Sequence, residues 1–386
     1  QWIRAQPSVD LDYMECVINQ EYILTDAASE ILDIPSSIIQ GLVQMERLVR
    51  AGIEETQHPV LFALAQGERG RPKYEFSVDL LTHLLEMPLP IKYVASLLRV
   101  SEATIFKRMC ENGISTRTLF SSMTDEELDD KIKTIKVRGP NAGYRLTKGL
   151  LQSEGHHVQR ERIKDSMHRV DSVGILSRLT RMGCTGRRTY SVKGPLSLVH
   201  IDTDHKLIRY NVVIFGGVDG YSRKIMYLNA ATVNKSSTAL NLFLESVQQC
   251  GWPQRYVRGD EGVENVSTAR CMFTGRSTGR GSFVSGKKSN DCGDIWMAVT
   301  QVYYEVLHTL EQDKLLDICN NIRMFCVHYV FLPRLIDDLQ TFTHGWDNHS
   351  IRTEQNLTPN QLWVMGHMKT TIDEPENLQQ VHNEIY

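Results

Sequence analysis

The sequence lacks long apolar runs, paired cysteine motifs and a charged-then-apolar leader. No apolar stretch approaches the roughly 20 residues of a membrane-spanning helix, so we expect no membrane segment and an intracellular protein. None of the eight cysteines forms a Cys-x-x-Cys pair, which excludes a zinc finger of the usual ligand spacing and favours reduced thiols. The 386 residues, 41% of them hydrophobic, are typical of a globular protein with two or three domains.

The net charge of −3 hides an uneven distribution along the chain. Residues 1–135 carry 13 basic and 21 acidic side chains, and residues 196–386 carry 17 and 21. Residues 136–188, in contrast, carry 12 basic and 4 acidic side chains, a net charge of +8. Such an excess in a short segment predicts binding to a polyanion. A pair of solvated basic helices without a ligand is the alternative.

Residues 91–114 have the pattern of two short helices joined by a tight turn. Ser101 is a good N-cap for a second helix that begins at Glu102. This arrangement resembles a helix-turn-helix, although Arg99 stands where the turn usually has glycine, and an ordinary helical hairpin is the alternative. The second helix would present three side chains to DNA, namely Thr104, Lys107 and Arg108.

A second helical unit overlaps the basic segment. Residues 124–127 form a capping box that predicts a helix start, and Gly139 predicts its end. The Gly-Tyr-Arg at residues 143–145, a helix, Gly155 and a basic helix near residues 159–170 follow in order. This order resembles the second helix-turn-helix of bacterial insertion-sequence transposases. The basic residues that the unit would offer to DNA are Arg145, Arg160, Arg162, Lys164 and Arg169.

From Leu196 the pattern becomes that of a sheet. We expect strands near residues 198–202, 210–215 and 225–228, a helix at 237–250 and a strand at 256–257. Three meandering strands, a helix and a strand added beside the first is the order of a ribonuclease-H-like sheet. Asp202 would lie on the central first strand and Asp260 just after the fourth. Because adjacent parallel strands run side by side, these two carboxylates should come together.

Four segments carry a more specific resemblance. They are His-Ile-Asp at residues 200–202, Gly-Val-Asp-Gly-Tyr-Ser-Arg at 217–223, Arg-Gly-Asp at 258–260 and Trp-Asp-Asn-His-Ser-Ile-Arg-Thr-Glu at 346–354. Over roughly residues 90–365 the chain resembles the integrase core of transposon-derived eukaryotic proteins, which are related to retroviral integrases. The resemblance implies DNA cutting and strand joining, duplex DNA as a partner, a homo-oligomer and a nuclear location.

The resemblance also implies a metal site. Integrases of this type use three carboxylates to hold two divalent cations, Mg²⁺ or Mn²⁺, for phosphodiester transfer. Asp202 would contact both cations, Asp260 would hold one of them, and a third acid on a later helix would hold the other.

The third acid is where the sequence departs from the family pattern of Asn, three residues, Glu, two residues and Trp. Residues 290–296 read Asn-Asp-Cys-Gly-Asp-Ile-Trp, with one residue fewer and no Glu. Counting forward from Asn290 assigns the acid to Asp294, whereas counting back from Trp296 assigns the position to Gly293. The third ligand is therefore either shortened or lost, which favours an impaired or inactive site.

Two functions remain open at this point. The first is a metal-dependent transposase or integrase that acts through Asp202, Asp260 and Asp294. The second is a domesticated, catalytically inactive DNA-binding protein that keeps the same scaffold.

Composition and motifs divide the chain into six expected regions. They are an N-terminal helical region (1–66), a helix-turn-helix (67–120), a second such unit (121–172), a basic connector (173–195), the catalytic core (196–315) and a C-terminal helical extension (316–386). In the tail we expect separate helices near residues 318–330 and 334–346. The expected fold is an α/β ribonuclease-H-like core with a mixed five-stranded sheet, preceded by all-α helix-turn-helix modules and followed by a helical tail.

Overall fold

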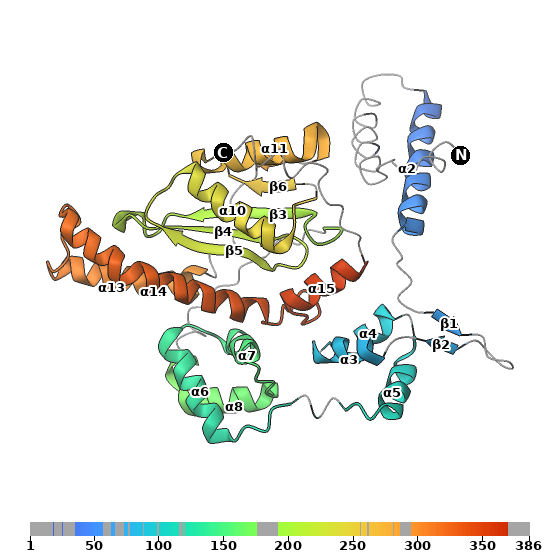
Figure 1. Ribbon diagram of the computed structural model, residues 1–386, viewed down its shortest axis with the longest axis horizontal. Helices are drawn as coiled ribbons and strands as arrows, with labels where there is room; N and C mark the ends of the chain where they lie inside the picture. The colour runs from blue at the N-terminus through green and yellow to red at the C-terminus, as the bar shows by residue number, and fades with distance from the viewer. Residues whose placement is uncertain are drawn as a thin grey trace. The chain divides into compact units, whose positions relative to one another are not determined.

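The computed structural model divides the chain into two compact units. One unit holds residues 1–60 and 368–371, and the other holds residues 61–367 and 372–386. The structure describes residues 18, 25, 35–56, 63–65, 73–75, 78–87, 89–98, 100–115, 118, 120–175, 192–254, 256–260, 262–280, 282–285 and 295–369. Helix α2 (Ser36–Thr56) belongs to the first unit, and the sheet belongs to the second (Figure 1). No helix in these ranges is both long and apolar enough to cross a membrane.

Five strands form the central sheet in the order β5-β4-β3-β6-β7. They are β3 (Leu198–Asp204), β4 (Val213–Asp219), β5 (Ile225–Ala231), β6 (Tyr256–Gly259) and β7 (Ser282–Ser285). Strands β3, β4 and β5 form an antiparallel meander, while β6 pairs in parallel with β3 and with β7. Helix α10 (Ser236–Cys250) supplies the crossover that a parallel pairing requires. The ribonuclease-H-like fold predicted from the sequence is therefore confirmed.

Helices cover both faces of this sheet. On one face, Val199 and Ile201 pack against Phe243 of α10 and Met272 of α11 (Val266–Arg280). On the other face, the core includes residues from β4, β5 and the C-terminal helices, namely Ile214, Leu228, Ile295, Val299, Leu335 and Leu339. Because Asp204 is paired with Ile214 across the sheet, and side chains alternate along a strand, Asp202 and Asp204 share this second face.

The tail departs from the sequence prediction. A single helix, α14 (Asn321–Asp347), replaces the two helices expected near residues 318–330 and 334–346, so that prediction is wrong. Pro333 lies inside α14 and removes one backbone donor. The apolar side that packs on the sheet nevertheless continues on both sides of this proline, with Met324, Val327, Leu335, Leu339 and Phe342. This continuous burial explains why the helix does not end at Pro333. Helix α13 (Gln301–Gln312) precedes it.

The first helix-turn-helix candidate contains α3 (Val78–Glu86), α4 (Ile91–Leu97) and α5 (Glu102–Glu111). The predicted cap is confirmed, because Ser101 Oγ accepts the backbone N–H of Thr104 at 3.2 Å. An antiparallel strand pair, β1 (Ala63–Ala65) and β2 (Lys73–Glu75), precedes these helices and was not anticipated from the sequence. Most of the predicted basic connector, residues 176–191, lies outside the described residues.

The second candidate contains α6 (Asp125–Arg138), α7 (Tyr144–Ser153) and α8 (Arg160–Val170). The predicted capping box is confirmed: Thr124 and Glu127 exchange hydrogen bonds at the start of α6. The three helices share a core of their own, with Leu128, Ile132, Leu151, Ile163 and Met167. Each of these side chains comes from the apolar side of its helix, as helical periodicity requires.

Helix α7 packs closely on α14. A side chain at Gly149 would collide with the carbonyl oxygen of Gly345, so glycine is required for the two backbones to approach. Beside this contact, Arg138 forms an ion pair of 2.7 Å with Asp337. The second helical unit is therefore joined to the same helix that covers the sheet.

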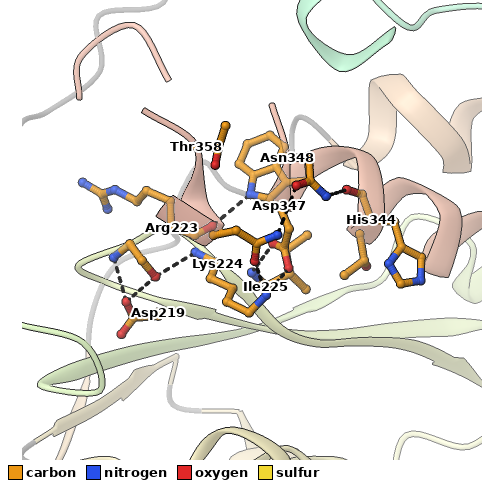
Figure 2. A network of polar contacts seen from close by, with 12 residues as sticks. Asp219, Arg223, Lys224, Ile225, His344, Asp347, Asn348 and Thr358 are labelled. Atoms are coloured by element: carbon orange, nitrogen blue, oxygen red, sulfur yellow. Dashed lines mark hydrogen bonds and ion pairs between the residues drawn. The ribbon is translucent and has the colours of Figure 1, made fainter. Parts of the chain in front are cut away.

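A polar network fixes the C-terminal end of α14 to the sheet (Figure 2). Lys224 Nζ lies 2.6 Å from Asp347 Oδ2, and the backbone N–H of Ile225 donates to Asp347 Oδ1 at 3.1 Å. Lys224 also donates to Asn360 Oδ1 on α15 (Pro359–Lys369) at 2.7 Å. Burial raises the pKa of Asp347, and the charge of Lys224 offsets part of that rise. The carboxylate thus depends on Lys224 to remain ionised.

Asp219 has a similar structural role at the end of β4. Its carboxylate accepts the backbone N–H groups of Leu196 at 2.8 Å and Ser222 at 2.7 Å, and the Ser222 hydroxyl at 2.6 Å. Burial raises the pKa of Asp219, and these hydrogen bonds lower it in part. Two acidic residues from the family-like segments, Asp219 and Asp347, are therefore structural and lie apart from the candidate metal ligands.

We predict that Lys224→Met destabilises the protein by about 3 kcal/mol, because it leaves the buried Asp347 carboxylate without its cation. Thermal unfolding should show a melting temperature several degrees below that of the unmodified chain. The control is Lys133→Met, which breaks the exposed pair with Asp130 and should leave the melting temperature nearly unchanged. Equal melting temperatures for the two variants would contradict the structural importance of the Lys224–Asp347 pair.

Candidate functional site

Asp202 and Asp260 lie where two parallel strands end side by side. Strands β3 and β6 are paired through three positions, the last of which sets His200 opposite Arg258. The ladder ends at this pair, and extending its register by two residues would place Asp202 opposite Asp260, just beyond the end of β6. The sequence prediction that the two carboxylates belong to neighbouring strands is therefore consistent with the observed register.

The backbone just before Asp260 packs tightly on β3. A Cβ atom on Gly259 would lie 3.0 Å from Ile201 Cγ1, so glycine permits this close approach. Asn265, which is buried, donates from Nδ2 to Asp260 Oδ1 at 2.7 Å. A hydrogen bond of this kind orients a carboxylate from behind, as supporting residues do around metal ligands.

Asp202 is half-buried on the face of the sheet covered by α14. Its Oδ1 accepts the backbone N–H of Thr203 at 2.9 Å. Nearby, burial raises the pKa of Tyr227, and the negative charge of Asp202 raises it further. The carboxylate thus contributes negative potential to a partly dehydrated region, which is the setting in which a cation binds well.

Asp204 is a further carboxylate, on the same face of β3 as Asp202, and sequence reasoning missed it. The side chain is only 7% exposed. Its Oδ1 accepts the backbone N–H of Lys206 at 3.0 Å, and Oδ2 lies 4.0 Å from Lys206 Nζ without a hydrogen bond. The ammonium of Lys206 in turn lies 4.6 Å from the ring centre of Trp296. The alternation Asp202-Thr203-Asp204 was the available signal, since residues two apart share a face.

The third predicted ligand, Asp294, lies outside the described residues, as does Gly293. The next residue, Ile295, is buried in the apolar core on the same face as Asp202. A π-helical turn at Trp296–Thr300 follows it. Such a turn changes which side chains of a helix face its neighbours. The assignment of the third acid to Asp294 or Gly293 stays a prediction.

Among the residues that the structure describes, no three His, Cys, Asp or Glu side chains converge closely enough to hold a metal ion. Asp202 and Asp260 supply hard oxygen atoms of the kind that Mg²⁺ and Mn²⁺ prefer. They fit a divalent cation as two ligands of a larger set. A complete site would need a further ligand from residues 286–294.

The predicted DNA-contacting residues of α5 differ in exposure. Lys107 is 77% exposed and lies 3.9 Å from Glu111. Arg108 forms a 3.1 Å ion pair with the same carboxylate. Thr104 is half-buried and interacts with the Ser101 hydroxyl at 2.9 Å. Contact of this helix with DNA stays a prediction, and Lys107 is its most accessible cation.

The basic residues predicted on α7 and α8 fall into two groups. Three of them form intramolecular ion pairs: Arg162 with Asp125, Arg169 with Asp129, and Lys164 with Glu161. The other two, Arg145 and Arg160, both donate hydrogen bonds to the Tyr144 hydroxyl. The structure thus brings Arg145 and Arg160 together and places Arg162 and Arg169 against the acidic side of α6.

We predict that Mg²⁺ or Mn²⁺ stabilises the protein only weakly, because two described carboxylates hold a cation less well than three. The melting temperature should rise by about 1 °C or less on adding either metal. Asp260→Asn should abolish this rise while keeping the hydrogen bond from Asn265. A rise of several degrees in the unmodified chain would contradict the prediction.

Comparison with known proteins finds one family model and several solved structures that resemble part of this chain. Residues 189–376 match the family model of the integrase core domain. Among solved structures, the chain is similar to the HTLV-2 integrase catalytic core domain in complex with magnesium in a trimeric form, with 16% identity, a TM-score of 0.27, and coverage of 44% of this chain and 96% of that chain. It is also similar to the simian T-cell lymphotropic virus intasome in complex with the PP2A regulatory subunit B56 gamma, with 14% identity, a TM-score of 0.31, and coverage of 57% and 72%. No curated protein matches the sequence significantly.

Proposed function

Because residues 189–376 match the family model of the integrase core domain, we propose that the protein binds duplex DNA and carries a phosphodiester-transfer site weakened at its third metal ligand. The observation that supports the proposal is the parallel pairing of β3 with β6, whose register, extended by two residues, would bring Asp202 beside Asp260. Two neighbouring carboxylates repel each other, and a cation bound between them would neutralise this repulsion.

The residues of this site would divide the work between binding and orientation. Asp202 and Asp260 would hold Mg²⁺ or Mn²⁺, and Asn265 would keep the Asp260 carboxylate in its orientation. When bound, paired divalent cations activate the attacking oxygen and stabilise the leaving oxygen of a phosphodiester. Asp294 would complete the ligand set, but its side chain is one methylene shorter than the Glu of the family pattern. That difference is large compared with the tolerance of about 0.2 Å on a metal–ligand distance.

Duplex DNA is the proposed substrate because the excess of positive charge lies next to the core in sequence. The segment of residues 136–188 carries a net charge of +8 and contains α7 and α8. A polyanion with regularly spaced phosphates is the ligand that such a charge excess favours. Action on chromosomal DNA would further require a nuclear location, which we propose on the same ground.

A second function, a DNA-binding protein without catalysis, is favoured by one specific observation. The segment between Asn290 and Trp296 is one residue shorter than the family pattern and contains no Glu. The described helix that follows it begins with a π-helical turn at Trp296–Thr300. If the third ligand is lost at Gly293, the scaffold would still bind DNA but would hold metal poorly.

A strand-nicking assay with Mn²⁺ separates the two functions. We expect weak or undetectable nicking by the unmodified chain and higher activity for Gly293→Glu or Asp294→Glu, because either change can restore the longer third ligand. Asp202→Asn, introduced into the more active variant, should abolish its gain and serves as the control. Robust strand transfer by the unmodified chain, lost in Asp294→Asn, would instead show that Asp294 is a fully working ligand.

We also propose that the protein acts as a homo-oligomer, because strand joining requires two DNA ends to be held at once. An exposed apolar stripe near the start of α14, formed by Ile322, Phe325 and Tyr329, supports self-association. Light scattering should give a mass that is a multiple of 44.1 kDa for the unmodified chain and a lower multiple for Phe325→Glu. A monomeric mass for the unmodified chain at high concentration would contradict this part of the proposal.

A further inference from the structure

The cations of helices α6, α7 and α8 differ in whether a carboxylate neutralises them. Most of them form ion pairs within the unit: Lys131–Glu154, Lys133–Asp130, Lys136–Asp171, Arg162–Asp125, Lys164–Glu161 and Arg169–Asp129. Arg145, Lys148 and Arg160 form no ion pair with any carboxylate in the described part of the chain. These three side chains are therefore the basic residues of this unit whose charge no described carboxylate neutralises.

Arg145 and Arg160 gather around Tyr144, the first residue of α7, and Lys148 lies about one helical turn further along the same helix. Arg145 Nε lies 3.1 Å from the Tyr144 hydroxyl oxygen, and Arg160 Nη2 lies 3.2 Å from the same atom. The guanidinium carbons of Arg145 and Arg160 lie 5.8 Å and 5.1 Å from the Tyr144 ring centre. One phenol therefore orients two guanidinium groups that would otherwise repel each other.

Nearby titratable groups respond to this concentration of charge. Burial lowers the pKa of Lys148, and the positive charge of Arg160 lowers it further. Burial likewise lowers the pKa of His157, with a further contribution from Lys148. For Tyr144, burial raises the pKa, but the hydrogen bond and charge of Arg145 together with the charges of Arg160 and Lys164 outweigh this effect and lower it. A cluster of like charges opposes folding, so packing alone does not explain it.

We propose that Tyr144, Arg145, Lys148 and Arg160 form a phosphate-binding site that holds a backbone phosphate of duplex DNA. The proposal rests on the DNA binding proposed above and names the residues that make the contact. Each guanidinium can donate two parallel hydrogen bonds to phosphate oxygens, the lysine supplies a further charge, and the tyrosine hydroxyl can donate as well.

The site also assigns different tasks to the basic residues of this unit. Arg162 and Arg169 stabilise the unit through Asp125 and Asp129 on α6, whereas Arg145 and Arg160 face the nucleic acid. Lys148 joins the second group although no sequence motif identified it. Contacts to phosphate fix the position of a protein on DNA without reading its sequence, so this site should bind all duplexes similarly.

The test uses the full chain and a labelled duplex, with fluorescence anisotropy measured over a range of salt concentrations. Arg160→Gln and Lys148→Met should each weaken binding roughly tenfold at low salt. Each should also reduce the slope of log affinity against log salt by about 0.9, the value for one lost phosphate contact. The matched control, Lys133→Gln, removes one charge from the neighbouring helix α6 at an ion-paired position and should leave affinity and slope unchanged.

Melting temperatures measured with and without inorganic phosphate complete the test. Phosphate should stabilise the unmodified chain more than it stabilises Arg160→Gln. Without phosphate, Lys148→Met should melt no lower than the unmodified chain, because the variant removes a like charge. A melting temperature several degrees lower for Lys148→Met would show that Lys148 has a structural role and would overturn its assignment to the site.

The possible failures can be told apart. Equal affinity and salt slope for Arg160→Gln and Lys133→Gln, with duplex binding by the unmodified chain intact, would overturn the phosphate site and leave the proposed function standing. Stabilisation by inorganic phosphate in a chain that does not bind duplex would overturn the assignment to DNA and the proposed function together.

Discussion

The arrangement of the core depends on the position of β3 at the centre of the sheet. This strand pairs antiparallel with β4 on one side and parallel with β6 on the other. It is covered by α10 and α11 on one face and by the α14 side of the core on the other. Because β3 has a neighbouring strand on each side and a packed layer on each face, its register cannot shift by one residue. Such a shift would exchange Val199 and Ile201 with the polar side chains of the opposite face. That constraint fixes the register of β3 against β6, which, if it extends by two residues, places Asp202 opposite Asp260.

The helical parts are joined to this core through α14. Its apolar side packs on the sheet, its C-terminal end is held by Lys224, and Gly345 receives Gly149 of α7. Helix α14 therefore joins α7, which carries part of the phosphate-binding site, to the sheet that carries Asp202. On the same helix, burial raises the pKa of Asp347, and the charge of Lys224 counteracts part of this rise. The attachment of the C-terminal end of α14 to the sheet therefore involves a buried ion pair.

The sequence was sufficient for the helix caps, because these depend on local patterns, whereas the expected strand order rested on the order of elements typical of a ribonuclease-H-like sheet. Ser101 and Thr124 were identified as N-caps because an N-cap can be recognised from the three residues that follow it. The length of α14 could not be predicted, because Pro333 is tolerated only where the surrounding helix packs on a sheet. Asp204 and Lys148 were missed for a related reason: the burial of Asp204 and the lack of a carboxylate partner for Lys148 are set by residues distant in sequence. The pairing of Arg169 with Asp129, 40 positions away, is an example.

The most direct test of the central claim is a crystal structure of the protein grown with a saturating concentration of Mn²⁺, with the metal located by anomalous scattering. The account predicts an anomalous peak between the carboxylates of Asp202 and Asp260, within the 2.0–2.2 Å or so of a metal–oxygen bond from both side chains. Carboxylates more than about 10 Å apart, or a peak that touches neither of them, would contradict a shared cation and with it the proposed phosphodiester-transfer site.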